Sequence, residues 1–190
     1  MYLLNDNTTM HNGITLAISI IVIGVILLFT ITLLLNLFFS PLLGTPKKIL
    51  GEIVDKMQLD KDDTLIDLGS GDGRLLLEAY TQSRCHCIGY ELSPIPVLLA
   101  RTKRILNYPN TEDISFELES IFQVEILEAT KVYCYLDKKS LQILTPKLEH
   151  LVRSGGEIYS LGNKIPKMKE QERVVLSNKN IMYIYKKCKK

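Results

Sequence analysis

Apolar and polar positions divide the chain into two unlike parts. Residues 14–39 are all apolar or small and polar except Asn36, and the first 46 residues hold one charged side chain, Asp6. At about 1.5 Å per residue, a helix of this length covers a hydrocarbon core of about 30 Å. The pattern therefore predicts one transmembrane helix over residues 14–39, preceded by a short extracytoplasmic N-terminus over residues 1–13.

The flanks of this apolar segment indicate a retained anchor. A cleaved signal peptide has a basic stretch, a shorter apolar run and a small-residue cleavage site. Here the leader is uncharged or acidic, and the run ends in Phe38-Phe39-Ser40-Pro41. Because the first lysine, Lys47, follows the apolar run, the positive-inside rule places the C-terminal part in the cytoplasm. We therefore expect a single-pass membrane protein that is anchored in the lipid bilayer.

Residues 45–190 have the pattern of one soluble domain, which follows a short hinge at residues 40–44. Thr45 and Pro46 are typical of a helix start, and apolar residues then recur every three or four positions as far as Met57. Short β-prone runs and helical stretches alternate after that. The expected strands cover residues 64–68, 85–90, 114–118, 132–136 and 157–161. One expected helix begins at residue 75, and two others cover residues 93–107 and 140–152.

This alternation predicts an α/β fold with a doubly wound, mostly parallel sheet and helices on both faces. Two further β-prone runs at residues 173–176 and 181–186 flank Asn178-Lys179-Asn180. Two strands joined by such a short polar turn pair antiparallel. The sheet is therefore expected to end in a C-terminal antiparallel hairpin.

The overall charge excludes one class of partner. The chain has 23 basic and 21 acidic residues, a net charge of +2, which gives no broad positive field to hold a nucleic-acid backbone. Its four cysteines lack the paired spacing of a zinc site or a disulfide framework. In Cys85-His86-Cys87, successive residues of a strand face opposite sides, and no other cysteine or histidine is near in sequence to complete a metal site. We therefore expect neither nucleic acid nor a metal.

The turn after the first strand carries the clearest candidate chemistry. Ligands of open parallel sheets bind beyond the carboxyl ends of the strands. Gly69, Gly71 and Gly73 follow that strand at every second position, and glycine lets the backbone approach a ligand closely without a Cβ in the way. Asp67, at the end of the strand, is placed to accept a hydrogen bond from an ammonium group. The turn is therefore a candidate nucleotide site.

The details of the turn favour S-adenosylmethionine over a dinucleotide. The pattern G-x-G-x-x-G needs a third glycine where this chain has Arg74. Asp72, at the start of the next helix, would repel a pyrophosphate. Glu91 closes the second strand 18 residues after Gly73, where an acidic side chain takes both ribose hydroxyls. A tight turn that binds nothing would explain the glycines but not this acid.

Several short motifs make the chain similar to a known family. They are Thr45-Pro46, the turn from Asp67 to Arg74, Gly89-Tyr90-Glu91, Val132-Tyr133-Cys134-Tyr135-Leu136 and Thr145-Pro146-Lys147-Leu148. With them, residues 42–165 resemble small class I methyltransferases. These are the bacterial and archaeal relatives of the mitochondrial lysine methyltransferases that modify the ATP synthase c subunit and the adenine nucleotide translocase. The resemblance implies a Rossmann-like class I methyltransferase fold.

The resemblance also implies which residues hold the cofactor. Asp67, Gly69 and Gly71 would hold its methionine part, Glu91 its ribose, and the segment after the third strand its adenine. The complete candidate set is Asp67, Gly69, Ser70, Gly71, Asp72, Gly73, Glu91, Leu92, Glu119, Ser120 and Ile121. In two places the chain departs from the family. Ser120 stands where the family usually has aspartate, so either the neighbouring Glu119 shifts into that register or Ser120 makes a weaker contact with the adenine amine. Leu161-Gly162-Asn163-Lys164 stands where the family often has an acidic-aromatic segment.

The expected reaction needs few catalytic residues. Methyl transfer to a lysine amine depends mainly on positioning and desolvation once the amine has lost its proton. Tyr135, at the end of the fourth strand, could orient that amine through its hydroxyl or ring; a half-buried strand tyrosine with no such role is the alternative. The prediction is a membrane-anchored protein-lysine methyltransferase. A lipid or small-molecule methyltransferase and a non-catalytic S-adenosylmethionine-binding protein remain alternatives.

Overall fold

The computed structural model describes residues 6–39 and 44–187, and it leaves aside the side chains of residues 6–13 and 34–39. The chain forms two compact units, Met1–Leu42 and Leu43–Lys190. Except for Gly44, the predicted hinge at residues 40–44 lies outside the described residues, as do residues 1–5 of the predicted N-terminal segment. Each unit is therefore considered by itself.

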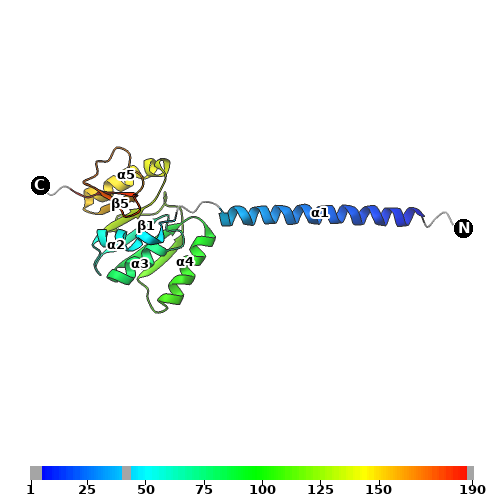
Figure 1. The fold of residues 1–190 in the computed structure, drawn as a ribbon, viewed down its shortest axis with the longest axis horizontal. Coiled ribbons are helices and arrows are strands. Elements are labelled where there is room, and N and C mark those ends of the chain that lie inside the picture. The colour runs from blue at the N-terminus through cyan, green and yellow to red at the C-terminus, as the bar shows by residue number, and fades with distance from the viewer. Residues whose placement is uncertain (1–5, 40–43, 188–190) are drawn as a thin grey trace. The chain divides into compact units, whose positions relative to one another are not determined.

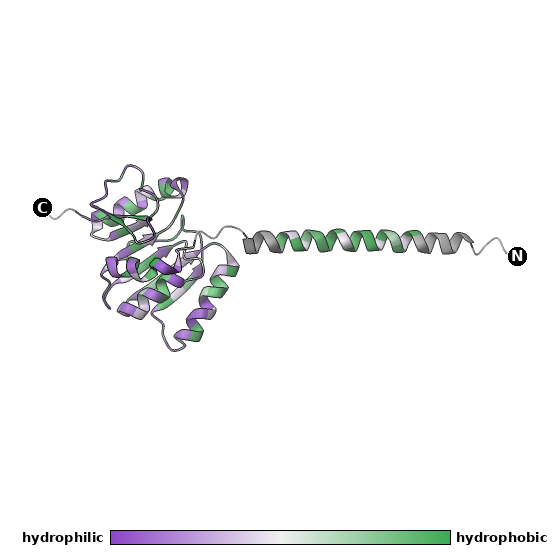
Figure 2. Ribbon diagram, viewed as in Figure 1, coloured by the Kyte–Doolittle hydropathy of each residue, from purple (hydrophilic) through white to green (hydrophobic). Residues whose placement is uncertain are grey.

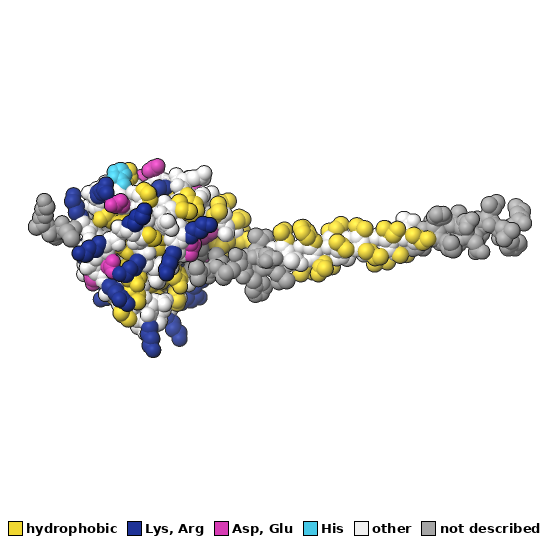
Figure 3. Space-filling view, turned by 90° about the horizontal axis from the view of Figure 1, so that it is seen from above, with side chains coloured by type: hydrophobic (Ala, Val, Ile, Leu, Met, Phe, Trp, Pro, Cys, Tyr) yellow, Lys and Arg dark blue, Asp and Glu magenta, His cyan; other side chains and the backbone are white. Residues whose placement is uncertain are grey.

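The first unit is a single long helix, α1, over Asp6–Phe39. The helix begins eight residues before the predicted transmembrane segment 14–39, since it includes the polar residues 6–13, and it ends where predicted. Within it, Ile14–Leu33 is long and apolar enough to cross a membrane, as judged by length and composition. Its side chains are exposed, and Figures 2 and 3 show apolar groups along this stretch in both views.

The second unit contains a seven-stranded sheet in the order β3-β2-β1-β4-β5-β7-β6. The first five strands in this order run parallel, β7 pairs antiparallel with β5, and β6 pairs antiparallel with β7. The doubly wound sheet and its C-terminal hairpin are therefore confirmed (Figure 1). The strands are β1 Thr64–Leu68, β2 His86–Glu91, β3 Ile114–Leu118, β4 Lys131–Cys134, β5 Glu157–Leu161, β6 Glu172–Val175 and β7 Ile181–Tyr185.

Helices cover the two faces of the sheet unequally. One apolar cluster joins a face of the sheet to α2, α3 and α4, and a second joins the other face to α5. The chain between β3 and β4 and the chain between β5 and β6 contain no helix within the described residues. The helices of this unit are the 3₁₀ helix η1 Lys47–Ile49, α2 Leu50–Met57, α3 Arg74–Ser83, α4 Pro94–Asn107 and α5 Lys138–Ser154.

The predicted helix start at Thr45 is wrong in detail. A 3₁₀ turn precedes α2, and no side chain caps either element. The buried Thr45 hydroxyl instead lies 2.7 Å from the Tyr133 hydroxyl. A buried phenol needs a hydrogen-bond partner, so Thr45 is used to attach the start of the domain to β4.

Candidate active site

The parallel register brings residues that are distant in sequence to one edge of the sheet. Leu68 at the end of β1 is in register with Tyr90 on β2 and with Cys134 on β4. The residues that follow these strands therefore lie side by side. The glycine turn begins between Glu91 and Tyr135, as the sequence predicted for the carboxyl ends of parallel strands.

Backbone hydrogen bonds fix the glycine turn against β2. The N–H groups of Gly69 and Ser70 donate to the Tyr90 carbonyl at 2.9 and 3.0 Å. All three glycines have positive φ, +91° at Gly69, +53° at Gly71 and +75° at Gly73, a region that costs other residues about 1–2 kcal/mol. The spacing G-x-G-x-G is therefore a requirement of the backbone path at this edge.

Glu91 joins the turn to the start of α4. Its carboxylate accepts a hydrogen bond from the N–H of Gly71 at 3.2 Å and another from the N–H of Ser93 at 2.8 Å. Each carboxylate oxygen keeps a further lone pair for a ligand. Glu91 is half-buried at the end of β2, so it can accept from ribose hydroxyls without breaking either backbone contact.

Asp67 is a buried carboxyl beside another carboxyl. Burial, and then the charge of Glu91, raise the pKa of Asp67 to about 8. Among the described residues, no cation offsets these two effects. A ligand ammonium at this carboxyl would favour its ionised form. The methionine part of S-adenosylmethionine carries such a group, so the residues at this edge fit that cofactor.

Ser70 and Asp72 direct their side chains away from the open edge. The Ser70 hydroxyl is buried, with no hydrogen-bond partner among the described residues, and it packs against the backbone at Gly89. Partial burial of Asp72 opposes its ionisation, but hydrogen bonds from Arg74 and Lys103 lower its pKa to about 2. These two cations neutralise Asp72, so the expected repulsion of phosphate is weaker than the sequence suggested.

The candidate adenine segment lies next to Glu91. The N–H of Glu119 donates to the Glu91 carbonyl at 3.1 Å, while the Glu119 side chain is exposed. The Ser120 hydroxyl accepts from the N–H of Phe122 at 3.4 Å, so it stabilises its own turn. Ile121 is half-buried against the second apolar cluster, and Leu92 is 68% exposed.

Tyr135 lies just past β4, three residues before the helix α5 begins at Lys138. It was expected inside a strand, but β4 ends at Cys134 because Asp137 caps α5 by accepting from the N–H groups of Lys139 and Ser140. The Tyr135 ring is half-buried against the loop after β5, where a Cβ on Gly162 would be 3.1 Å from it. Its position at the edge is compatible with the predicted orienting role.

Asn163 lies in the loop beside Tyr135 and makes contacts that the sequence did not indicate. Its side-chain amide donates to the Leu136 carbonyl at 2.9 Å, and its backbone carbonyl accepts from the Ser160 hydroxyl at 2.7 Å. Asn163 thereby holds the loop after β5 against the end of β4. Only the departure from the family pattern at Leu161–Lys164 pointed to this loop.

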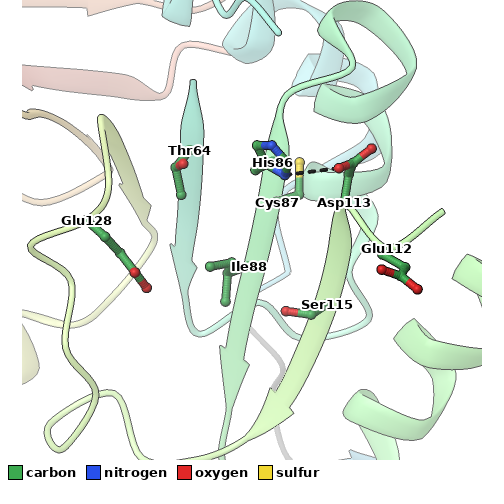
Figure 4. A pocket seen from close by; sticks show the side chains of 8 residues that line it. All are labelled: Thr64, His86, Cys87, Ile88, Glu112, Asp113, Ser115 and Glu128. Atoms are coloured by element: carbon green, nitrogen blue, oxygen red, sulfur yellow. Dashed lines mark ion pairs between the residues drawn. The ribbon is translucent and has the colours of Figure 1, made fainter. Parts of the chain in front are cut away.

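A depression of about 270 Å³ lies at the opposite edge, where β1, β2 and β3 begin (Figure 4). His86 and Asp113 form an ion pair there, 3.0 Å long. Its lining also contains Thr64, Cys87, Ile88, Glu112, Ser115 and Glu128. Among the described residues, no three or more His, Cys, Asp or Glu side chains lie close enough together to hold a metal ion. Because ligands of parallel sheets bind at the carboxyl ends, this depression is not the cofactor site.

Comparisons with known proteins point to the same region. Residues 67–172 match the ANTKMT methyltransferase domain. A protein-lysine N-methyltransferase of Saccharolobus islandicus (strain REY15A) is 27% identical over 149 residues, which cover 76% of this chain and 92% of that protein. The adenine nucleotide translocase lysine N-methyltransferase of Mus musculus is 30% identical over 96 residues, which cover 50% of this chain and 42% of that protein.

A solved structure supports both the fold and the cofactor. An RNA methyltransferase from Salinibacter ruber, in complex with S-adenosyl-L-homocysteine, is 27% identical with a TM-score of 0.67 and covers 75% of this chain and 92% of that one. The class I methyltransferase fold and S-adenosylmethionine as cofactor are therefore confirmed. The family match begins at Asp67 and includes the glycine turn, Glu91 and Tyr135. Since it covers more than half of the chain, this S-adenosylmethionine-dependent methyltransferase belongs to the ANTKMT methyltransferase domain family.

Proposed function

We propose that the chain transfers a methyl group to the side-chain amine of lysine in a protein at or in a membrane. The observation that carries this proposal is the likeness to a protein-lysine N-methyltransferase along 92% of that relative. The mouse relative acts, by its name, on a translocase lysine. The apolar stretch Ile14–Leu33 supports a location at the membrane.

The site residues have separable tasks in this proposal. Ionised Asp67 accepts from an ammonium group, and Glu91 accepts from ribose hydroxyls beside it. The bound cofactor supplies an electrophilic methyl group on a sulfonium. Tyr135 and the loop held by Asn163 orient the acceptor amine and exclude water, and the amine loses its proton to solvent before transfer. Positioning of this kind accounts for catalysis without a strong acid or base at the edge.

The remaining predicted cofactor residues would still line the cofactor site, but several would act through backbone atoms or by holding the turn in place. Gly69, Ser70, Gly71 and Gly73 would act through the backbone of the turn, and Asp72 would hold that turn to α3 and α4. Leu92, Glu119, Ser120 and Ile121 would border the adenine, with Ser120 contributing its backbone because its hydroxyl bonds to Phe122.

The organisation of the chain follows from the proposed membrane location. Residues 14–39 would span the bilayer once, residues 40–44 would form the hinge, and the domain of residues 45–190 would face the cytoplasm. Lys47 and Lys48 are exposed and follow the apolar helix, which agrees with the positive-inside rule. Residues 1–13 would then lie outside.

The chemical class of the acceptor can be tested with labelled cofactor. The full chain in its native membranes, or reconstituted in liposomes with a membrane extract, is incubated with methyl-labelled S-adenosylmethionine. We expect label in protein, on lysine after hydrolysis. Label in the organic phase would select a lipid acceptor, and label in RNA would select the acceptor class named for the Salinibacter structure. Cofactor binding without any labelled product would favour a non-catalytic role.

A Glu91→Ala chain is the control for other methyltransferases in the extract. Because Glu91 holds both the turn and the ribose in this proposal, its loss should strongly reduce the added label in every fraction when the cofactor is kept below its Kd. Label that also forms in extract without any added chain comes from the extract, whereas added label that persists with this variant would contradict the assignment. A Glu128→Ala chain, altered at the opposite edge, should label as the wild type does.

A further inference from the structure

The solvent-facing side of α4 is apolar, contrary to the usual pattern of a surface helix. Pro96, Val97 and Ala100 form its buried side against the sheet. At 3.6 residues per turn, the opposite side is a continuous stripe, because its members are spaced by one, three or four positions. The stripe consists of Ile95, Leu98, Leu99, Thr102, Ile105 and Leu106, and Figure 2 shows the apolar residues along α4.

The exposure of this stripe is unusually high. Leu98 is 65% exposed, Ile105 is 54% exposed and Leu106 is 77% exposed. Leu92 and Leu118 are also exposed, and they lie at the adjacent ends of β2 and β3, since Leu118 is in register with Glu91. A contiguous apolar surface of this kind marks an interaction site. It reaches from the cofactor edge along the whole helix.

The charges on α4 identify the chemistry of the partner. The helix contains Arg101, Lys103 and Arg104 and no acidic residue. Arg101 and Lys103 lie beside the stripe, whereas Arg104 lies on the buried side of the helix. Arg101 bonds to the Phe116 carbonyl and pairs with Glu117, Lys103 pairs with Asp72, and Arg104 bonds to the Thr111 carbonyl. An apolar face with basic flanks is typical of a helix that lies in the interface of an anionic bilayer.

The connection to α1 limits the distance between the domain and the bilayer. Six residues lead from Phe39, where α1 ends, to Thr45, which is bonded to Tyr133. At no more than about 3.6 Å per residue, a chain of this length reaches at most about 22 Å. The Thr45 carbonyl also accepts from Arg74 at the start of α3, so this attachment lies at the same carboxyl edge from which α4 starts.

We propose that the exposed stripe of α4 lies in the headgroup region of the bilayer that α1 spans. This inference rests on the anchoring part of the proposed function. Removal of aliphatic side chains from water is favourable, so a few such side chains suffice to orient a tethered domain. Docked in this way, the cofactor edge lies next to the membrane, where the acceptor lysine of an embedded protein would be reached.

The proposal is tested with single-cysteine variants of the full chain in liposomes that contain anionic lipid. Leu98→Cys in a Cys188→Ser background is labelled with an environment-sensitive fluorophore; Cys85, Cys87 and Cys134 are buried. Ile143→Cys is the matched control, because Ile143 is 56% exposed on α5. We expect a severalfold stronger, blue-shifted emission at position 98 that is quenched by spin-labelled lipid and protected from aqueous iodide. The control should show the reverse.

Other outcomes overturn the proposal in distinguishable ways. Chain that does not float with liposomes refutes the anchor and this docking together. Floating chain whose label at position 98 stays open to iodide refutes the docking alone. Protection from iodide without quenching by lipid means that protein, such as a second copy of the chain, covers the stripe.

A pair of charged variants provides a second measurement. With the label at Ile105→Cys, the changes Leu98→Glu and Leu106→Glu together should abolish the blue shift. Circular dichroism should stay unchanged, because both side chains are exposed. Ile143→Glu should leave the blue shift intact, and an equal loss with this control would contradict docking through α4.

Discussion

Replacement of Gly73 by alanine should destabilise the domain by about 3 kcal/mol or more. Gly73 has a φ of +75°, and a Cβ there would be 2.5 Å from the Phe116 ring and 2.9 Å from the Ala100 Cβ. The backbone strain costs about 1–2 kcal/mol, and overpacking in a core typically adds about 1–3 kcal/mol. Denaturant unfolding of the full chain in detergent measures the effect as a change in the free energy of unfolding.

Gly71→Ala is the matched control for this prediction. Gly71 also has a positive φ, +53°, but no atom lies within 4 Å of the position that a Cβ would take. The variant should therefore show the backbone strain alone, about 1–2 kcal/mol. If the two variants lose equal free energy of unfolding, the close packing of β3 and α4 against Gly73 is not the reason that glycine is needed there.

Asp67→Asn should stabilise the cofactor-free protein as the pH rises. The pKa of Asp67 is raised from 3.8 to about 8 by burial and by Glu91, so between these pH values the folded chain holds a proton that the unfolded chain has lost. The stability of the wild type therefore falls as the pH rises from about 4 to 8. Asparagine does not titrate, so the variant should gain about 2–5 kcal/mol at pH 8 and almost nothing at pH 4.

The same substitution should weaken cofactor binding. Hydrogen bonds to charged groups contribute about 1.5–3 kcal/mol, so loss of the contact to an ammonium should raise the Kd by about tenfold or more. At pH 7 the wild type should also release a proton on binding, because the ligand favours the ionised carboxyl. Calorimetry in buffers of different ionisation enthalpy measures this release. A variant that is less stable at pH 8 and binds as tightly as the wild type would contradict the role of Asp67.

The sequence was sufficient for the order of the elements because hydrophobic periodicity determines which faces are buried. The strand that ends at Leu68, the helix that ends at Asn107 and the C-terminal hairpin were predicted within a few residues. The position of Glu91 beside the turn also followed, since parallel strands align their carboxyl ends. These features depend on local pattern and on one topological rule.

The choice of side-chain partners could not be predicted in the same way. Asp72 bonds to Lys103, 31 residues away in sequence, and Thr45 bonds to Tyr133, 88 residues away. Either residue would also have been suitable for a local role at a helix start. Which role is used depends on the neighbours that the fold supplies, and a single sequence does not specify them.

The exposed stripe of α4 was missed for a related reason. Periodicity shows that Leu98 and Leu106 are apolar and lie on a helix, but the usual assumption places such residues in the core. In this helix the small residues Pro96 and Ala100 face the sheet, and the larger ones face outward. The packing of the helix was needed to identify which side is exposed.

Calorimetric titration of the full chain with S-adenosylmethionine tests the central claim, that the edge formed by Asp67, the glycine turn and Glu91 holds the cofactor. The wild type should bind, Glu91→Ala should lose about tenfold or more in affinity, and Glu128→Ala at the opposite edge should bind as the wild type does. No binding by the wild type, or an equal loss in the two variants, would contradict the account.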